Sequence, residues 1–287
     1  MPAPAHLRAL LQATPLLVLP GVYDGLSARV AEQAGFPALY ISGGAVSRSV
    51  GLPDLGLLSA DAVIARVGEI VRAVGVPCLA DADTGYGNPL HVRRTVQAFE
   101  RAGAAGLHLE DQVEPKQCGH YDDTQVIDAG DMVQKIRAAT DARTDPDFLI
   151  VARTDARTPH GLDEAISRAN LYASSGADMV FIEAPRSTSE LAEIARRVRA
   201  PLLVNMFVGG KTPFVPPQEL AAMGYRVMIV PSDLQRAAIA GMQRAASALR
   251  EEGTARSLGD ALVSFEERER VVGLAGWREA ERRYTVR

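Results

Sequence analysis

Short apolar runs alternate with stretches of helical spacing along almost the whole chain. The runs are aliphatic and β-branched, which predicts eight strands at Leu16–Leu19, Ala38–Ile41, Val76–Ala80, Gly106–Leu109, Phe148–Ala152, Met179–Ile182, Leu202–Asn205 and Arg226–Val230. Apolar residues at intervals of three or four predict helices at Gly25–Gln33, Ala60–Val74, His91–Arg101, Asp131–Ala142, Leu162–Ser175, Ser189–Val198 and Pro217–Met223. Near-continuous hydrophobic strands are typical of a parallel sheet covered on both sides, and eight βα units predict an α/β fold, the closed (β/α)₈ TIM barrel.

An open, doubly wound sheet is the main alternative fold. Such a sheet usually carries a GxGxxG loop after its first strand, whereas Pro20-Gly21-Val22-Tyr23-Asp24 follows the first run here. The barrel is therefore favoured. No Pro-rich or Ser/Gly-rich linker divides the 287 residues, so we expect one barrel domain over residues 1–287 with a C-terminal helical arm at about 252–287.

The C-terminal segment predicts three further helices, at Asp233–Glu251, Ser257–Arg270 and Leu274–Tyr284. It carries more apolar side chains than a lone surface helix needs: Leu258, Leu262, Val263, Phe265, Val271, Val272, Leu274 and Trp277. These side chains pack either on the bottom of the chain's own barrel or on another subunit. A homo-oligomer is the simpler expectation.

Composition and charge exclude some partners. The formal net charge of −4 comes from interspersed residues, and aromatic residues make up only 5%, so we expect no nucleic-acid partner. The chain has no run of about 18 apolar residues and no signal-like start, so we expect no membrane partner and a cytoplasmic protein. Cys78 lies in an apolar run and Cys118 in a polar loop, and both are expected to be reduced.

Polar residues follow six consecutive predicted strands. In a barrel, the carboxyl ends of the strands face one mouth, so these residues predict a polar pocket there. They are Ser42, Asp81 with Asp83, Glu110, Arg153, Glu183 and Asn205.

Three carboxylates, Asp81, Asp83 and Glu110, come from adjacent strands and would repel one another unless a cation neutralised them. Oxygen ligands without Cys or His among them favour Mg²⁺, or Mn²⁺, over zinc. For Asp81 or Asp83 taken alone, the alternative is a cap on the following helix.

Arg153 would be costly to bury unpaired, and its planar fork suits a substrate carboxylate. A structural ion pair with Glu183 is the alternative. Tyr40 is expected near the metal and could assist proton transfer, although a tyrosine ending a strand often only packs.

Ser42 with the amides of Gly43 and Gly44 predicts an anion seat, because glycine allows close approach to the backbone. A plain tight turn is the alternative. Asn205 and Thr212 could hold a second carboxylate, and Thr212 follows a glycine pair that suggests a mobile loop.

Cys118 lies in the stretch Lys116-Gln117-Cys118-Gly119-His120. Lys116 and His120 beside the sulfur are expected to favour the thiolate and tune its proton affinity, while Gly119 allows the loop to move. An ordinary surface turn is the alternative. The pattern predicts a mobile catalytic loop.

Together these residues resemble the isocitrate lyase and phosphoenolpyruvate mutase superfamily over nearly the whole chain. The motifs that carry the resemblance are Asp81-Ala82-Asp83-Thr84-Gly85-Tyr86-Gly87, Glu110-Asp111-Gln112, Lys116-Gln117-Cys118-Gly119-His120, Ala152-Arg153-Thr154-Asp155-Ala156 and Gly209-Gly210-Lys211-Thr212-Pro213. The resemblance implies a Mg²⁺-binding barrel that commonly forms tetramers by exchanging terminal helices.

The thiol in the loop is similar to the carbon–carbon lyases of the superfamily, which include 2-methylisocitrate and dimethylmalate lyases. That likeness implies the metal shell Asp81, Asp83 and Glu110, and the acid Cys118. It further implies a substrate pocket made by Tyr40, Ser42, Gly43, Gly44, Arg153, Glu183, Asn205, Thr212 and Arg236. The chain departs from the family pattern at Gln117, where the lyases usually have Arg or Lys, and at Val208, where many relatives have Glu.

The function that these features predict is cleavage of a 2-hydroxy di- or tricarboxylate into a 2-oxo acid such as pyruvate and a carboxylate. The alternatives are a carboxyphosphonoenolpyruvate phosphonomutase-like enzyme, an oxaloacetate decarboxylase-like enzyme, and a non-catalytic oxo-acid-binding protein.

Overall fold

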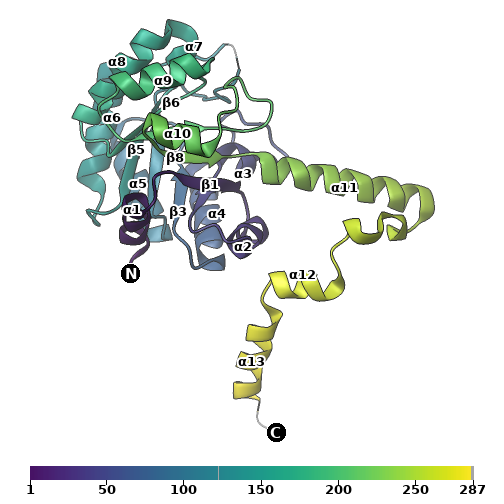
Figure 1. Cartoon of the computed structure of the whole chain (residues 1–287). Helices are drawn as coiled ribbons and strands as arrows, with labels where there is room; N and C mark the ends of the chain where they lie inside the picture. The colour runs from purple at the N-terminus through teal and green to yellow at the C-terminus, as the bar shows by residue number, and fades with distance from the viewer. Residues whose placement is uncertain (122, 286–287) are drawn as a thin grey trace.

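Eight parallel strands form a closed barrel at the centre of the computed structural model, which describes residues 1–121 and 123–285 (Figure 1). Each strand pairs with its neighbour along the chain, and β8 pairs with β1 to complete the ring. The strands are β1 (Leu17–Val22), β2 (Leu39–Ile41), β3 (Cys78–Asp81), β4 (Gly106–Glu110), β5 (Leu149–Thr154), β6 (Met179–Ile182), β7 (Leu202–Asn205) and β8 (Tyr225–Val230). The predicted (β/α)₈ barrel is confirmed.

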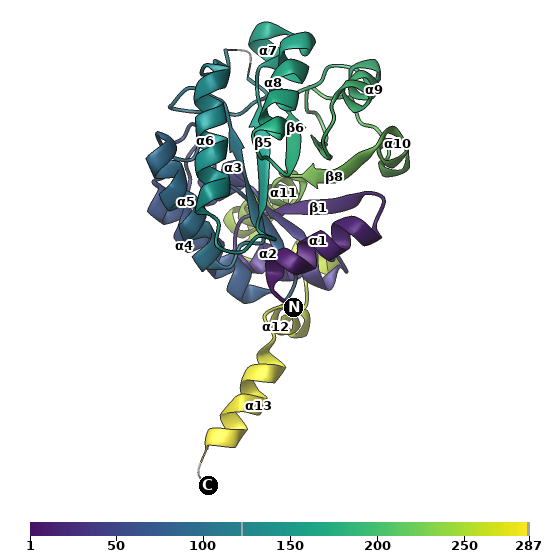
Figure 2. The same ribbon diagram turned by 90° about the vertical axis from the view of Figure 1, so that its left-hand side faces the viewer.

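Helices surround the barrel between successive strands (Figure 2). All seven that the periodicity predicts are present: α2 (Gly25–Gln33), α4 (Ala60–Ala73), α5 (Pro89–Ala102), α6 (Ala129–Ala142), α8 (Leu162–Ser174), α9 (Thr188–Arg197) and α10 (Pro217–Met223). Side-chain caps fix several of their starts. Asp24, Ser59 and Asn88 each accept a backbone N–H of the first turn.

Three helices were not predicted: α1 (Ala3–Ala13), α3 (Gly43–Ser49) and α7 (Arg157–His160). Helix α1 precedes the barrel, and its Leu7 joins the apolar cluster inside it. Helix α3 begins directly after Ser42, so the predicted anion seat is the first turn of a short helix.

The core has two layers. One apolar cluster fills the barrel interior and includes Leu17, Leu19 and Phe181, whereas a larger one lies between the strands and the surrounding helices. Every residue of β2, β3 and β4 is buried, as expected for strands covered on both faces. This rigid frame positions the side chains at the strand ends.

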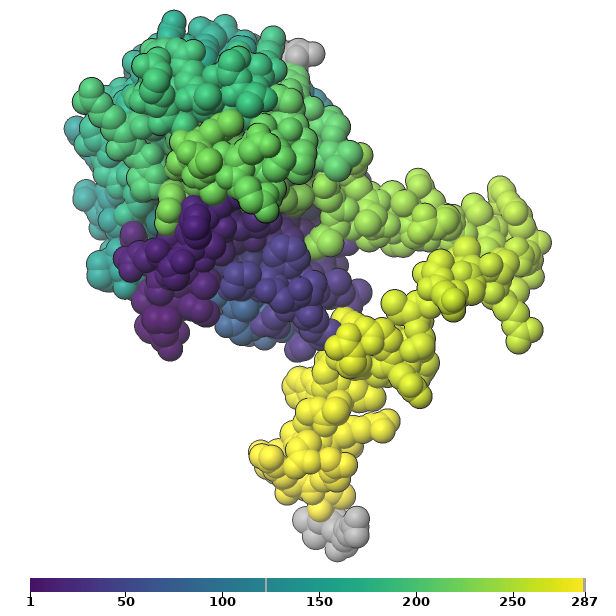
Figure 3. Space-filling view, viewed as in Figure 1, coloured from purple at the N-terminus to yellow at the C-terminus, as the bar shows by residue number. Residues whose placement is uncertain are grey.

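The C-terminal arm expected at about 252–287 holds the 3₁₀ helix η1 (Arg256–Ala261), α12 (Phe265–Val271) and α13 (Leu274–Tyr284). It continues from α11 (Asp233–Glu252), and together they project from the barrel (Figures 1 and 3). The prediction of one helix over Ser257–Arg270 is wrong. Gly259 has a non-helical φ of 49°, and Ser264 starts a new helix by accepting the Glu267 N–H at 3.0 Å.

Most apolar side chains of the arm are exposed on the described chain, whereas Leu258, Val271 and Leu274 are half-buried. Trp277, Phe265 and Val263 are 72%, 69% and 69% exposed. The arm does touch the barrel through α12, where Gln33 Nε2 donates to Val271 O at 3.0 Å. Packing on the chain's own barrel therefore does not account for these residues.

Among the described residues, no helix combines the length and the apolar character that crossing a bilayer requires.

Candidate active site

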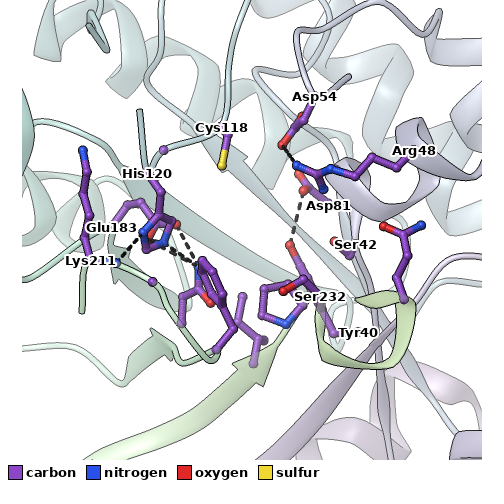
Figure 4. A pocket seen from close by; sticks show the side chains of 18 of the residues that line it. Tyr40, Ser42, Arg48, Asp54, Asp81, Cys118, His120, Glu183, Lys211 and Ser232 are labelled. Atoms are coloured by element: carbon purple, nitrogen blue, oxygen red, sulfur yellow. Dashed lines mark hydrogen bonds and ion pairs between the residues drawn. The ribbon is translucent and has the colours of Figure 1, made fainter. Parts of the chain in front are cut away.

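A cavity of about 390 Å³ lies at the carboxyl ends of the strands (Figure 4). Eleven of the predicted site residues line it: Tyr40, Ser42, Gly44, Asp81, Lys116, Cys118, His120, Arg153, Glu183, Asn205 and Arg236. The predicted polar pocket is therefore present. Its walls come from segments far apart in the sequence, brought together by the closure of the barrel.

Asp81, His108 and Glu110 form a buried group whose potential ligand atoms lie within 4.8 Å of one another. Neither oxygen of Glu110 accepts a hydrogen bond from a described residue, and burial, opposed by Arg153, raises the pKa of this carboxyl well above its usual value. Burial also works against ionisation of Asp81, but His108, Lys116 and Arg153 bring its pKa down to about 2. A buried carboxylate without donors fits a cation site.

Sequence reasoning missed His108. Side chains two residues apart lie on the same face of a strand, so His108 lies on the same face of β4 as Glu110. The prediction that Glu110 faces the pocket could therefore have been extended to His108. Burial lowers the pKa of His108 to about 4, so the ring is neutral at pH 7.

Asp83 lies beside Lys116 instead of within this group. Its carboxylate is 2.7 Å from Lys116 Nζ, which also lies 2.6 Å from Asp54 Oδ1. Burial raises the pKa of Asp83 to about 6 although Lys116 opposes the shift. The Asp83 N–H donates to Asp81 Oδ1 at 3.0 Å, so Asp83 supports Asp81. Its role as a metal ligand stays a prediction, and Asp54 carried no signal in the sequence.

The Tyr40 hydroxyl lies 2.8 Å from His108 Nε2 and 3.2 Å from Asp81 Oδ2. Burial, reinforced by Asp81, raises the pKa of Tyr40 well above its usual value, so the phenol keeps its proton. A protonated Tyr40 can donate a hydrogen bond to a bound oxygen. A role as proton acceptor would need the opposite shift.

Arg153 is enclosed by carboxylates. Its guanidinium lies 3.1 Å from Glu110, 2.8 Å from Asp155 and 3.4 Å from Glu183. Burial opposes ionisation of Glu183, but Arg153 and His120 lower its pKa to about 2. The ion pair with Glu183 considered above exists, and it lies on the cavity wall. Arg153 thus combines structural pairing with access to the cavity.

The loop that carries Cys118 is anchored at its base and its tip. Gln112 and Gln117 exchange two hydrogen bonds, at 2.9 and 3.0 Å. His120 Nδ1 accepts the Lys211 N–H at 3.0 Å, so Nε2 carries the proton and faces Glu183 Oε1 at 3.2 Å. The loop is held against the cavity, with Cys118 on the wall (Figure 4).

The expected activation of a thiolate by Lys116 and His120 is not what the structure shows. Lys116 is held in an ion pair with Asp54, and His120 faces Glu183 through Nε2. Burial raises the pKa of Cys118 although the backbone N–H of His120 opposes the shift. The sulfur is therefore a protonated thiol at neutral pH. Such a group suits proton donation better than nucleophilic attack.

Several of the remaining predicted site residues already form hydrogen bonds within the protein. Ser42 caps α3, and the Gly43 N–H already donates to Asp81 Oδ2 at 3.1 Å, which leaves Gly44 on the cavity wall. Thr212 is buried away from the cavity lining, and its Oγ1 has no hydrogen-bond partner among the described residues. Arg236 lines the cavity and donates to Val208 O.

The sequence matches the family model described as phosphoenolpyruvate phosphomutase over residues 7–250. The chain is 42% identical over 283 residues to 2,3-dimethylmalate lyase of Eubacterium barkeri, covering 98% of both chains. It is 43% identical over 277 residues to 2-methylisocitrate lyase of Aeropyrum pernix, covering 96% of this chain and 88% of that protein.

The fold matches the solved structure of a phosphonopyruvate hydrolase in complex with oxalate and Mg²⁺. The TM-score is 0.90 at 30% sequence identity, with 99% of each chain covered. The chain therefore belongs to the phosphoenolpyruvate mutase and isocitrate lyase superfamily, and the relatives named above are two lyases and a hydrolase. The family resemblance and the expectation of an enzyme are confirmed.

Proposed function

We propose that the protein is a Mg²⁺-dependent carbon–carbon lyase that cleaves a 2-hydroxy di- or tricarboxylate of the methylisocitrate or dimethylmalate type. The products are a 2-oxo acid such as pyruvate and a second carboxylate. The observation that carries the proposal is one cavity lined by Asp81, Arg153 and the protonated thiol of Cys118, with the buried carboxyl group of Glu110 3.1 Å from Arg153. The names of two relatives that match nearly the whole chain support it.

Asp81 and Glu110 would hold the metal, with His108 beside them and Asp83 predicted to act through Asp81 or a water. Oxygen donors dominate this set because His108 Nε2 already faces the Tyr40 hydroxyl, and such a set favours Mg²⁺, or Mn²⁺, over zinc. When bound, Mg²⁺ would lower the pKa of the substrate hydroxyl and offset negative charge on the substrate oxygens. The related hydrolase that binds Mg²⁺ with oxalate supports this assignment.

The protein's own groups orient the substrate and supply a proton. We assign Ser42, Gly44 and Arg153 to the carboxylate of the future 2-oxo acid, with Tyr40 as a hydrogen-bond donor. The hydroxyl gives its proton to a carboxylate of the metal site, which releases it to solvent, and becomes the carbonyl as the carbon–carbon bond breaks. The bonding electron pair then moves onto the carbon of the departing carboxylate.

Cys118 completes the reaction by giving its proton to that carbon. The raised pKa means that the thiol carries the proton before each turnover, and the resulting thiolate takes one back from solvent. Proton and charge are thereby conserved over the cycle. Loop anchoring by His120 and Gln117 keeps water away from the carbanion-like fragment.

The assay that tests the proposal couples pyruvate or glyoxylate formation to NADH oxidation in the presence of Mg²⁺. The substrates are methylisocitrate, isocitrate, dimethylmalate, citramalate and oxaloacetate. Stoichiometric formation of a 2-oxo acid and a second carboxylate supports the lyase. Carbon dioxide release from oxaloacetate would identify the decarboxylase, and binding without turnover would identify the non-catalytic protein. A separate incubation with a phosphonate substrate, followed by phosphorus-31 NMR, would identify the phosphonomutase.

Gly119→Ala is expected to lower turnover on the order of 10-fold or more, because near-attack geometry tolerates little displacement. A Cβ at position 119 would contact Arg153 Nη2 and lie 2.6 Å from both Asp155 Oδ1 and Glu183 Cγ. Steady-state kinetics with an unchanged melting temperature would show this. Gly75→Ala is the control, since its Cβ would meet only Glu32 Oε1 at 3.5 Å. Equal kinetics for Gly119→Ala and wild type would mean that the loop lies elsewhere during catalysis.

We also propose that the chain assembles into a tetramer by exchanging its C-terminal arm, as the family resemblance implies. Helix α11 buries only Gln235 and Ala248 against the described chain, although it follows the last barrel strand. The exposed apolar side chains of α12 and α13 lie beyond it (Figure 3). A second subunit that covers these residues would remove them from water. A cytoplasmic location stays a prediction.

A variant with both Phe265→Glu and Trp277→Glu is expected to lose the tetramer, because two charges would enter the covered apolar face. Light scattering after size-exclusion chromatography measures the mass, and Arg278→Ala in the same helix serves as the control. The barrel itself should stay folded, since both residues are exposed on the single chain. A monomeric wild-type protein would contradict arm exchange.

A further inference from the structure

Arg48 is a cationic side chain on the cavity wall that the reaction described above does not use. It lies on α3, close to Asp54 (Figure 4). Its Nη2 is 3.9 Å from Asp54 Oδ2, which is long for an ion pair, and the other Asp54 oxygen already lies 2.6 Å from Lys116 Nζ. No hydrogen bond from the Arg48 guanidinium to a described residue is present, and the side chain is 38% exposed. Arg48 therefore has donors left for a ligand.

Gly44 creates the space in which the Arg48 guanidinium lies. A Cβ at position 44 would be 2.5 Å from Asp54 Oδ2 and 3.0 Å from Arg48 Nη1. Both side chains therefore pack against bare backbone at the start of α3, where Ser42 and Gly44 face the cavity. The guanidinium therefore lies beside the wall of the cavity where the substrate is proposed to bind.

Arg48 lies on the thiol side of the cavity. Cys118 and Asp54 line the same cavity as Arg48, and the Arg48 guanidinium is next to Asp54. Figure 4 shows Cys118 with Asp54 and Arg48 to one side of it and His120 with Glu183 to the other. The carbon that receives a proton from Cys118 must lie near this side.

The other cations on the cavity wall are already neutralised or hydrogen bonded. Lys116 contacts Asp54 and Asp83, and Arg153 contacts three carboxylates. Lys211, which also lines the cavity, donates from Nζ to Tyr121 O at 2.9 Å. Arg236 donates to Val208 O and lies 3.7 Å from Asp233. An additional negative charge on the substrate near Cys118 would therefore meet Arg48 as the least neutralised of these partners.

We propose that Arg48 binds an extra carboxylate on the fragment that Cys118 protonates, and that it selects 2-hydroxy tricarboxylates over dicarboxylates. This inference rests on the proposed lyase function. A guanidinium with free N–H groups can bind a carboxylate through two parallel hydrogen bonds, whereas a methyl group at the same place gains nothing from it. The substrate class is thus a methylisocitrate-type acid that leaves a dicarboxylate such as succinate.

The test compares kcat/KM for 2-methylisocitrate and 2,3-dimethylmalate in wild type, Arg48→Ala and Arg48→Lys. Loss of a charge-assisted contact predicts that kcat/KM for 2-methylisocitrate divided by kcat/KM for 2,3-dimethylmalate falls on the order of 30-fold in Arg48→Ala. Arg48→Lys should recover part of the ratio by keeping the charge. Arg196→Ala, a 73%-exposed arginine of α9, should keep the wild-type ratio.

An equal loss on both substrates would overturn the proposal, because Arg48 would then act only by supporting Asp54. An unchanged ratio would overturn it as well. If wild type turns over neither acid, the lyase proposal fails, and equilibrium binding of the two acids with Mg²⁺ to Cys118→Ser protein judges Arg48 separately. If the double variant with Cys118→Ser and Arg48→Ala loses the preference for the tricarboxylate that Cys118→Ser alone shows, the selective role of Arg48 is supported. If the double variant keeps that preference, the role is excluded.

Discussion

Replacing Cys118 by serine is expected to lower kcat on the order of 100-fold or more, as the loss of a positioned acid does. A serine hydroxyl is a far weaker acid than a thiol, so it cannot protonate the departing carbon at a comparable rate. The surrounding contacts should survive, because the loop is anchored by Gln117 and His120 and not by the sulfur. Mg²⁺ binding should therefore stay intact.

Steady-state kinetics measures kcat. A Mg²⁺ titration that uses the melting temperature as its readout measures metal binding. Cys78→Ser is not a suitable control, since Cys78 is buried in an apolar cluster, but Cys78→Ala removes the other thiol without adding a polar group. It should keep wild-type turnover. Comparable kcat in Cys118→Ser and wild type would remove the thiol from the mechanism.

Removing the metal is expected to abolish turnover, and Glu110→Gln should raise the Mg²⁺ concentration for half-maximal activity on the order of 100-fold. Both oxygens of Glu110 are buried and accept no hydrogen bond from a described residue, and the nearest cation is the Arg153 guanidinium at 3.1 Å, which three carboxylates share. The carboxylate therefore retains charge and lone pairs with which to meet a metal ion. Amide substitution keeps the shape and removes the charge.

Activity restored by Mg²⁺ or Mn²⁺ after chelation, together with a metal-dependent rise in melting temperature, would check this account. Glu219→Gln on the exposed surface of α10 is the control and should keep the wild-type metal dependence. Full activity in the presence of chelator, or equal metal dependence of Glu110→Gln and wild type, would contradict a metal held by this group.

The barrel could be predicted because its strands are buried on both faces. Such strands must be continuous apolar runs, and the polar residue that ends each run then marks the mouth. Asp81, Glu110, Arg153, Glu183 and Asn205 were located in this way, and each is buried at its strand end. Helix α3 was missed because a glycine pair after a strand predicts a turn as readily as a helix start.

Which charged side chains contact one another inside the site could not be predicted from the sequence. Lys116 is two residues from Cys118 in the chain, which suggests that it acts on the sulfur, yet its Nζ contacts Asp54 and Asp83. His108 lacked a signal of its own because a histidine within an apolar run is usually packing. The arm was expected to be helical. The break before Phe265 arises because the Ser264 side chain caps a new helix, and the spacing of apolar residues carries no information about such a cap.

The central claim is that a bound hydroxy acid is cleaved at a carbon–carbon bond and that Cys118 protonates the new carbon centre. NMR of the products formed in D₂O with Mg²⁺ tests this claim most directly. The account predicts pyruvate or another 2-oxo acid together with a carboxylate that carries one solvent deuterium at the carbon released from the broken bond. Products whose carbon skeleton is intact, or a carboxylate fragment without deuterium at that carbon, would contradict it.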